Sequence, residues 1–314
     1  MTGATTTKIF LKKAVATAFD FIFPNLCVLC GEWIPLTENT DDEITTRVNA
    51  LCRNCEKFLI KTPNKKGADS ICRVCGKIIH PDGKRKQNSD FNLYRNNILI
   101  KECEYGGNLS SIAAEPSYNN NHKTYFTPDI LCHTCKNDIL KGNAPSFKAA
   151  RTSIIYNDTA RQLIHLMKYS MSPRIAVYLA RYLAEAFGDF KEAHNKCDII
   201  IPVPLYWLRQ LRRGYNQSEI LARELSRRIR IPCLNNVLKR RRSTTHQARL
   251  GRTERLKNVK DVFEVINPDK VKGKKILLVD DVMTTGATFN GCAAALKSKG
   301  AEEVYCLAVA RRME

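Results

Sequence analysis

The stretch KKILLVDDVMTTGATFNGC, Lys274 to Cys292, decides the fold and the place of the functional site. Its apolar segment, Ile276 to Val279, reads as a buried strand and runs directly into two acidic residues, Asp280 and Asp281. A loop of small and hydroxyl-bearing residues follows. Burial alone does not require this order, and ligands of open α/β sheets bind beyond the carboxyl ends of strands. The stretch therefore predicts a ligand site.

Apolar strands alternate with amphipathic helices on both sides of this stretch. Ala160, Leu163, Ile164 and Met167, for example, recur at the spacing of one helix face. The pattern predicts strands at residues 152–156, 197–202, 275–279 and 304–309, and helices from Asp158, Pro173 and Asn216 and over residues 288–299. Strands and helices at this spacing form βαβ units, so the predicted fold class is α/β with a mostly parallel sheet and flanking helices.

The loop from Thr284 to Thr288 suits a phosphate group. Few side chains are in the way, so backbone N–H groups can converge on an anion at the positive end of the following helix. The preceding carboxylates repel phosphate, but they accept hydrogen bonds from sugar hydroxyls or reach a divalent cation through water. A sugar that carries one phosphate satisfies both halves of the motif.

Other nucleotide motifs fit less well. A Walker loop requires Gly-Lys followed by Ser or Thr, and no lysine lies between Lys275 and Lys297. A dinucleotide fold requires Gly-x-Gly-x-x-Gly, which is missing. Receiver domains place their acids near the start of the domain and lack the threonine-rich loop. An acidic turn that only caps a helix is the structural alternative.

Length and charge limit the class of protein. The chain has 314 residues, which suggests two domains, and a formal net charge of +20. Such a surplus attracts phosphates, nucleic acid or acidic membrane, although a basic soluble protein without an anionic partner is the alternative.

The N-terminal stretch KIFLKKAVATAFDFIFPNL is too short and too charged to span a bilayer. No small-residue cleavage site precedes Pro24, so a signal peptide is less favoured. We expect residues 1–24 to form an amphipathic helix on the body of the protein and find no transmembrane segment.

Eight of the 13 cysteines form four Cys-x-x-Cys pairs before residue 136. A disulfide network has no reason to repeat a two-residue gap, whereas a tight turn places two thiolates on one side of a metal ion. A redox-active pair is the alternative, but no thioredoxin-like context surrounds these pairs. The predicted zinc ligands are Cys27, Cys30, Cys52 and Cys55 for one Zn²⁺ and Cys72, Cys75, Cys132 and Cys135 for a second. Free thiolates favour a reducing, cytoplasmic location.

The composition changes near residue 145, where Gly142 to Ala150 reads as a linker. Residues 25–141 are expected to hold a double zinc ribbon region with an Asn-rich insertion over about 77–130. Residues 151–314 are expected to form the α/β domain.

The signature ILLVDDVMTTGAT resembles the phosphoribosyl-diphosphate (PRPP) motif of type I phosphoribosyltransferases. Together with LIHLMKYS, IIPVPLYWLRQLRRGYNQSEILARELS and THQARLGRTERLKNVKDVF, it resembles the ComF family of competence proteins. That family pairs an N-terminal zinc ribbon region with a phosphoribosyltransferase-like domain. The resemblance covers Tyr156 to Arg311, and FPNLCVLCG also fits it.

The resemblance implies roles for individual residues. Asp280 and Asp281 would bind the ribose hydroxyls at the catalytic site, and the 5′-phosphate would lie on Thr284, Thr285, Gly286, Ala287 and Thr288. The diphosphate would lie on a loop with Val203 and Pro204, although these residues can equally end a strand. Mg²⁺ and basic side chains would stabilise the leaving group, and the candidates are Lys168, Arg212 and Arg213, each of which can equally be a surface charge. Residues 239–260 resemble a flexible closing loop.

Two functions follow, and the residues leave both open. The first is Mg²⁺-dependent PRPP binding, with phosphoribosyl transfer to an acceptor that the sequence does not identify. The second is a non-catalytic single-stranded DNA-binding module of the DNA-uptake machinery, as the family's link to competence favours. Residues 205–258 carry fifteen Lys or Arg against three Asp or Glu, with Tyr206, Trp207 and Tyr215 as stacking candidates. A solvated basic helix face is the plain alternative.

Overall fold

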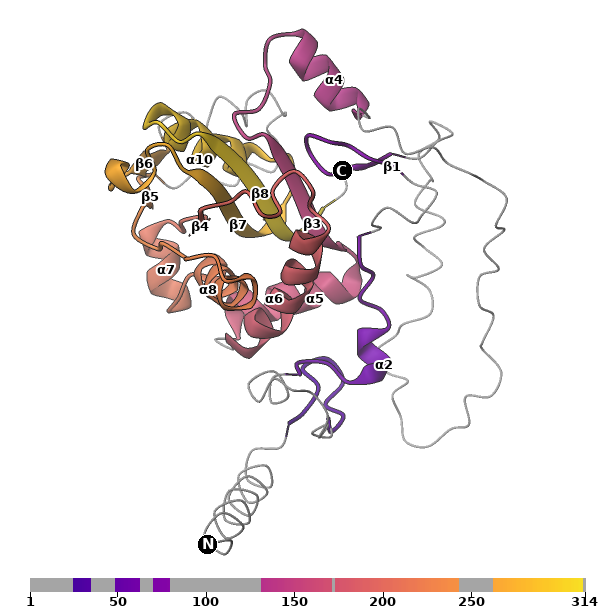
Figure 1. Cartoon of the computed structure of the whole chain (residues 1–314). Helices are drawn as coiled ribbons and strands as arrows, with labels where there is room; N and C mark the ends of the chain where they lie inside the picture. The colour runs from indigo at the N-terminus through magenta and orange to yellow at the C-terminus, as the bar shows by residue number, and fades with distance from the viewer. Residues whose placement is uncertain are drawn as a thin grey trace, which may run out of the picture. The chain divides into compact units, whose positions relative to one another are not determined.

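The computed structural model describes residues 25–34, 49–62, 70–79, 131–170, 173–242 and 262–312 (Figure 1). The expected N-terminal helix, most of the Asn-rich insertion and residues 243–260 of the expected closing loop lie outside the described residues. Contacts divide the chain into two compact units, Met1–Phe58 and Leu59–Glu314. Among the described helices, none has the length and apolar character needed to cross a membrane.

The larger unit is built on a parallel sheet. In the described residues its strands lie in the order β3 (Ala149–Ile155), β8 (Glu303–Arg311), β7 (Lys275–Met283) and β4 (Ile199–Pro202). The register places Leu277 of β7 between Tyr305 of β8 and Ile200 of β4. This arrangement confirms the predicted α/β fold class.

Helices cover both faces of this sheet (Figure 1). One face packs against α6 (Pro173–Gly188) and α8 (Gln217–Ile229), with α5 (Asp158–Tyr169) beside α6. On the other face lies α10 (Ala287–Ser298), next to the antiparallel pair β5 (Leu238–Arg240) and β6 (Phe263–Val265). Successive side chains of Ile276 to Val279 therefore enter opposite cores, and all four residues are buried.

Helix α5 follows its predicted pattern, because its buried residues are the four predicted from the periodicity, Ala160, Leu163, Ile164 and Met167. The side chain of Asn157 caps the helix by accepting a hydrogen bond of 2.9 Å from the N–H of Ala160. In α6, the sequence spacing of Ile175, Tyr178, Leu179, Tyr182 and Ala186 predicts one apolar face, and all of these except Ala186 are buried.

Two elements differ from the predicted pattern. Strand β7 runs on to Met283, which pairs with Arg311, so Asp280 and Asp281 lie within the strand rather than after it. The sheet extends because β8 also continues past its apolar segment. A short helix, α7 (Trp207–Arg213), was not predicted; it has seven residues, too few for a periodicity window, and buries none of them.

Strand β3 lies at one edge of the sheet, and earlier chain segments pair with its open side. The N–H of Ile155 donates to the carbonyl of Ile60 at 2.8 Å, and the N–H of Thr62 donates to that of Ser153 at 2.9 Å. Near the other end of the strand, the N–H of Ala150 donates to the carbonyl of Val74 at 2.8 Å. These bonds satisfy an edge that would otherwise be open to pairing with other chains.

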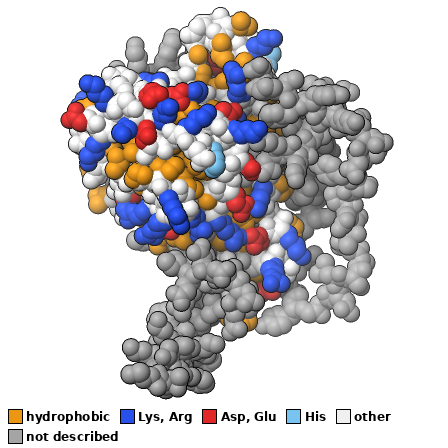
Figure 2. Space-filling view, in the orientation of Figure 1, with side chains coloured by type: hydrophobic (Ala, Val, Ile, Leu, Met, Phe, Trp, Pro, Cys, Tyr) orange, Lys and Arg blue, Asp and Glu red, His pale blue; other side chains and the backbone are white. Residues whose placement is uncertain are grey.

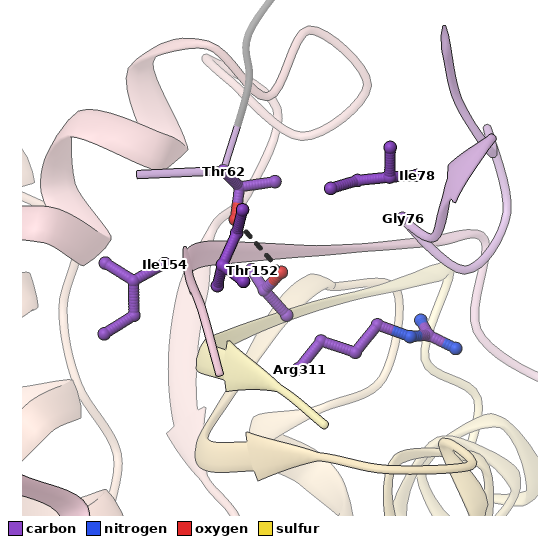
Figure 3. A pocket seen from close by; sticks show the side chains of 7 residues that line it. Thr62, Gly76, Ile78, Thr152, Ile154 and Arg311 are labelled. Carbon is purple, nitrogen blue, oxygen red and sulfur yellow. Dashed lines mark hydrogen bonds between the residues drawn. The ribbon is translucent and has the colours of Figure 1, made fainter. Parts of the chain in front are cut away.

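Figure 3 shows a small pocket beside this edge, where the hydroxyls of Thr62 and Thr152 lie 3.5 Å apart. Gly76, Ile78 and Arg311 also line it. Its cavity volume is about 20 Å³, which is room for about one water molecule. The pocket is therefore too small for a sugar phosphate.

The second cysteine knuckle packs directly on the sheet. This knuckle, the turn from Cys72 to Cys75, lies between β1 (Ser70–Ile71) and β2 (Ile78–Ile79). The other cysteine pair of the group lies at the start of helix α4 (His133–Leu140), with Cys132 just before the helix and Cys135 within it. The guanidinium of Arg151 on β3 donates to the carbonyl of Arg73 at 3.0 Å, and that of Arg311 on β8 donates to the carbonyl of Cys75. The compact unit therefore begins before this knuckle rather than at the Gly142–Ala150 linker. The domain bounds stay a prediction, because contacts do not show which segments fold independently.

Substitution of Gly76 tests how closely the knuckle packs against β3. It has a φ of +70°, and a Cβ there would lie 2.5 Å from the carbonyl oxygen of Ala150. Gly142 has a similar φ of +72°, but nothing lies within 4 Å of its Cβ position. We expect Gly142→Ala to lower the free energy of unfolding by about 1–2 kcal/mol through backbone strain alone. Gly76→Ala should lower it by about 2–5 kcal/mol, because the overpacking adds to the strain. Chemical denaturation of the full chain measures both, and equal losses would contradict the packing.

Candidate functional site

The acidic pair lies where the carboxyl end of β7 meets the first turn of α8. Helix α8 begins after Asn216, whose side chain accepts a 3.1 Å hydrogen bond from the N–H of Ser218. The side-chain amide of the same asparagine donates to the carbonyl of Val203 at 3.1 Å. The cap therefore fixes Gln217 and Ser218 next to the end of β4, facing the carboxylates of the neighbouring strand.

Asp281 is the more deeply buried acid, with 5% of its surface exposed. Its Oδ2 lies 2.8 Å from the Nζ of Lys168 and accepts a 3.0 Å hydrogen bond from the amide of Gln217. Burial alone would raise the pKa of Asp281, but the charge and hydrogen bond of Lys168 outweigh it and lower that pKa. Burial would likewise lower the pKa of Lys168, and the carboxylate raises it instead. The two groups form a charged pair.

Asp280 has different partners. Its Oδ1 accepts hydrogen bonds from the hydroxyl of Ser218 at 2.7 Å and from the backbone N–H of Asp281 at 2.8 Å. Both donors are neutral, and the residue is only half-buried. Burial, with added repulsion from Asp281, raises the pKa of Asp280 to about 7. Asp281 is therefore ion-paired, whereas the pKa of its neighbour Asp280 is close to neutral pH.

The end of helix α5 is held by the turn that precedes α8. The hydroxyl of Tyr215 donates to the carbonyl of Met167. The guanidinium of Arg213 donates to the hydroxyl of Tyr169 at 3.4 Å and lies 5.1 Å from the centre of that ring. Gly214, with a φ of +78°, allows the chain to reverse between these two contacts. The segments LIHLMKYS and RRGYNQS therefore meet around Lys168.

The small loop after β7 leads into the start of α10. Gly286 precedes the helix with a φ of +82°, and no side chain caps the helix start at this residue. The loop is fixed from both sides, because the N–H of Arg312 donates to the carbonyl of Met283 at 3.0 Å and that of Asn290 to Gly286 at 2.8 Å. The hydroxyl of Thr285 accepts from the N–H of Ala287 at 3.4 Å, and the start of this twelve-residue helix has a positive dipole end, the usual setting for an anion.

The predicted diphosphate residues offer less. The N–H of Val203 donates to the carbonyl of Val279 at 2.9 Å, and its own carbonyl accepts from Asn216. Pro204 has no N–H. The backbone of these two residues therefore serves the sheet and the α8 cap. Among the basic candidates, Lys168 forms an ion pair with Asp281, and Arg213 packs against the ring of Tyr169. Arg212 is exposed.

Gln217 and Ser218 were missed from the sequence as partners of the acids. A signal exists, because both are polar and yet 4% and 3% exposed, respectively. Ser218 lies on the same face of α8 as Leu221, Ala222 and Leu225, which are three, four and seven residues further on, so its polar side chain faces inward.

The cysteine pairs form two groups of four, as predicted. One contains Cys27, Cys30, Cys52 and Cys55 and the other Cys72, Cys75, Cys132 and Cys135; in each group the sulfur atoms lie within 4.8 Å of one another. The Sγ atoms of Cys30 and Cys52 lie 3.7 Å apart, and those of Cys75 and Cys132 lie 3.6 Å apart. Tetrahedral zinc with Zn–S bonds of about 2.3 Å requires about 3.8 Å. Both groups fit Zn²⁺, and their lack of disulfides fits a thiolate site.

The two groups share one local design. In each knuckle the first cysteine's carbonyl accepts from a glycine N–H, Gly31 or Gly76, at 2.9 Å. Both glycines have positive φ, +76° and +70°. The second pair of each group straddles the start of a short helix, α2 (Arg53–Glu56) or α4, whose positive end favours thiolates.

Comparison with known proteins identifies the family. A model of the phosphoribosyl transferase domain matches residues 169–314. Competence protein F of Haemophilus influenzae is 40% identical over 152 residues, 48% of this chain and 66% of that protein. The DNA utilization protein YhgH of Shigella flexneri is 35% identical over 167 residues, 52% of this chain and 73% of that protein. The chain belongs to the ComF family.

Two further similarities are more distant. Competence protein ComFC of Bacillus subtilis is 29% identical over 151 residues, 48% of this chain and 58% of that protein. Among solved structures, the glutamine PRPP amidotransferase of B. subtilis, complexed with ADP and GMP, is 18% identical, with a TM-score of 0.31 over 46% of this chain and 30% of that chain.

The zinc content tests the cysteine groups of this ComF protein. We expect two zinc ions per chain, and Cys30→Ser or Cys75→Ser should each remove about one, because a tetrahedral site needs its fourth thiolate. Cys75 is part of the core beneath the sheet, so its variant should also lower the thermal unfolding temperature of the larger unit. Elemental analysis and circular dichroism measure the two effects. Cys233→Ser, outside both groups, is the control; an unchanged zinc content in Cys75→Ser would contradict the second site.

Proposed function

We propose that this ComF protein binds PRPP together with Mg²⁺ at the carboxyl end of β7. The observation that carries the proposal is the succession of carboxylates and a helix start at Gly286 within a few residues of one strand end. Hydroxyl acceptors and phosphate donors are the two needs of a pentose phosphate. The family match over residues 169–314 supports the same ligand class.

In this proposal, different residues bind the phosphate and the sugar of PRPP. The start of α10 with Thr284, Thr285 and Thr288 receives the 5′-phosphate, and the acid pair receives the ribose hydroxyls. Mg²⁺, when bound with PRPP, neutralises charge on the diphosphate. Lys168 neutralises Asp281, and Arg213 beside Tyr169 adds a further positive charge nearby, which favours a ligand with several phosphates.

A role in the use of incoming DNA extends the proposal. The H. influenzae relative is named a competence protein, and the S. flexneri relative a DNA utilization protein. We infer the same process for this chain from that kinship.

Titration calorimetry with PRPP tests the ligand. Wild-type protein should bind PRPP in the presence of Mg²⁺ and more weakly without it. Thr284 is exposed at the loop, so its substitution should not disturb the fold. Thr284→Glu should weaken binding by at least about tenfold, because a carboxylate near the phosphate costs 1–4 kcal/mol at surface-like dielectrics. Thr284→Gln, which has the same shape without the charge, should lose less. No binding heat for wild type with PRPP and Mg²⁺ would refute the proposal.

Single-stranded DNA is a second candidate ligand, favoured by the surface of α7. Trp207 and Leu211 on this helix are 58% and 76% exposed, and arginines alternate with them at 209, 212 and 213. In Figure 2, blue Lys and Arg side chains gather along the lower edge of the coloured surface, where Figure 1 places α7 and α8. Exposed aromatic rings among cations are the usual platform for unpaired bases.

The two tryptophans of the chain provide a matched test. Trp33 is 59% exposed, as open as Trp207, but lies in the other compact unit. Trp207→Ala should weaken binding of a labelled oligothymidine by about 1–3 kcal/mol through lost stacking, and Trp33→Ala should not. Fluorescence anisotropy over a range of salt concentrations measures this, with a log–log slope of about −0.7 per phosphate contacted. Equal effects of both variants would argue against α7 as the platform.

A further inference from the structure

The second cysteine group and the start of α10 belong to one core. The buried side chains packed in this core include Cys72, Cys75, Cys132, Cys135, Phe147, Met283 and Phe289. Met283 ends β7 and Phe289 lies in the first turn of α10, and each is only 2% exposed. Protein cores are close-packed, so they transmit a displacement instead of absorbing it. A change at the cysteine group therefore has a route to the loop between β7 and α10.

Arg311 joins the cysteine group to the end of β7. Its Nη1 donates to the carbonyl of Cys75 and lies 3.8 Å from the Sδ of Met283. The backbone repeats this connection, because Arg311 pairs with Met283 in the sheet and the N–H of Arg312 donates to the carbonyl of Met283 at 3.0 Å. A single guanidinium therefore contacts both the knuckle and the last residue before the loop.

Met283 extends this contact to the turn into α10. Gly286 precedes the helix with a φ of +82°, and a Cβ at that position would lie 2.8 Å from the Cε of Met283 and 3.8 Å from the Cζ of Phe147. The methyl group of Met283 therefore lies directly against the backbone of the turn. Two side chains, those of Arg311 and Met283, are enough to connect Cys75 with the start of α10.

The first cysteine group has the same ligands in a more open setting. Gly31 and Gly76 occupy the same place in the two knuckles, but a Cβ at Gly31 would meet nothing within 4 Å, whereas one at Gly76 would lie 2.5 Å from the carbonyl oxygen of Ala150. Cys30 and Cys55 are half-buried, whereas all four cysteines of the second group are buried. The first group is thus an internal control, with the same metal chemistry and without the close packing found at Gly76.

We propose that the second cysteine group, when it holds zinc, sets the position of the loop between β7 and α10, with Arg311 and Met283 as the positioning residues that connect them. The inference rests on the proposed PRPP site and adds its regulation. Four thiolates on one ion fix the turn from Cys72 to Cys75 and give it a net negative charge, which favours a guanidinium beside it. Without the metal that turn is no longer held, and Arg311 loses a fixed acceptor. The affinity for PRPP is therefore higher in the zinc-loaded chain.

Substitution of Arg311 tests both ends of the connection. Arg311→Met keeps an apolar stem and removes the guanidinium, so the zinc affinity of the second site should fall by about 10–100-fold, the usual cost of losing an outer-shell partner. Even with both sites filled with zinc, residues 284–292 should exchange their amide hydrogens faster in this variant. Its PRPP affinity should be lower by about 5–150-fold, the usual range of coupling between two sites. Hydrogen exchange with mass spectrometry and titration calorimetry measure these effects in the full chain.

Two matched variants each affect one end only. Arg151→Met removes a donor to the same knuckle, at 3.0 Å from the carbonyl of Arg73, and should lower the zinc affinity while leaving exchange of residues 284–292 unchanged once the site is filled. Met283→Leu, a substitution of similar volume, displaces the methyl group from the turn and should speed that exchange with little change in zinc affinity. Unchanged exchange in Arg311→Met at full zinc loading would overturn the proposal.

Thermodynamic linkage gives a test that needs no variant at the connection. If zinc at the second group raises the affinity for PRPP by some factor, PRPP must raise the affinity for that zinc by the same factor. Competition with a zinc chelator, with and without PRPP and Mg²⁺, measures this factor. Cys30→Ser, which should retain only the second zinc, should show the same increase, and Cys75→Ser, which should retain only the first, should show none. Equal increases in the two variants would contradict a specific role of the second group.

Failure of this inference and failure of the PRPP proposal give different results. If the wild-type chain binds no PRPP, the proposed ligand is wrong, and hydrogen exchange alone then tests the connection. Faster exchange of residues 284–292 in Arg311→Met than in Arg151→Met supports it, and equal exchange overturns it. If PRPP binds to the wild-type chain and to Arg311→Met with equal affinity, the PRPP site stands and its regulation by the cysteine group is wrong.

Discussion

The buried charge of Asp281 is the constraint on which the functional end of the sheet depends. A carboxylate with 5% of its surface exposed requires a cation, and the cation comes from the far end of α5. Removing one partner of a buried ion pair costs about 3–5 kcal/mol. The pair therefore ties together segments more than a hundred residues apart in sequence, and the turn from Arg213 to Tyr215 holds the helix end that carries Lys168.

The position of the loop between β7 and α10 follows from this anchor. Once the end of β7 is held on one side by α5 and α8, β8 holds it on the other through the pairing of Met283 with Arg311. The chain then has only a few residues, Thr284 to Gly286, in which to turn into α10. A short loop between two fixed ends has little conformational freedom to lose on binding, so a ligand there would not have to order it.

The sequence predicted the features that depend on local pattern and failed where distant segments meet. The sheet strands, the buried face of α5 and both cysteine groups follow from periodicity and spacing. The pairing of Lys168 with Asp281 leaves no trace in either segment alone, because it exists only when the helix end reaches the strand end. Helix α7 escaped prediction for a different reason, since its seven residues are too few for a periodicity window and none of them is buried.

The second cysteine group belongs to the larger unit, which begins at Leu59. The change of composition near residue 145 separates a cysteine-rich region from a strand-rich one, but the knuckle and the strand share a surface. A zinc ion with four thiolates carries two net negative charges, and the guanidinium groups of Arg151 and Arg311 approach the carbonyls of that knuckle from β3 and β8. Because Arg311 also pairs with Met283, the residue that contacts the knuckle lies opposite the last residue of β7, directly before the loop that begins at Thr284. The knuckle is thus part of the scaffold that ends at the site, although nothing in its own sequence distinguishes it from the knuckle at Cys27.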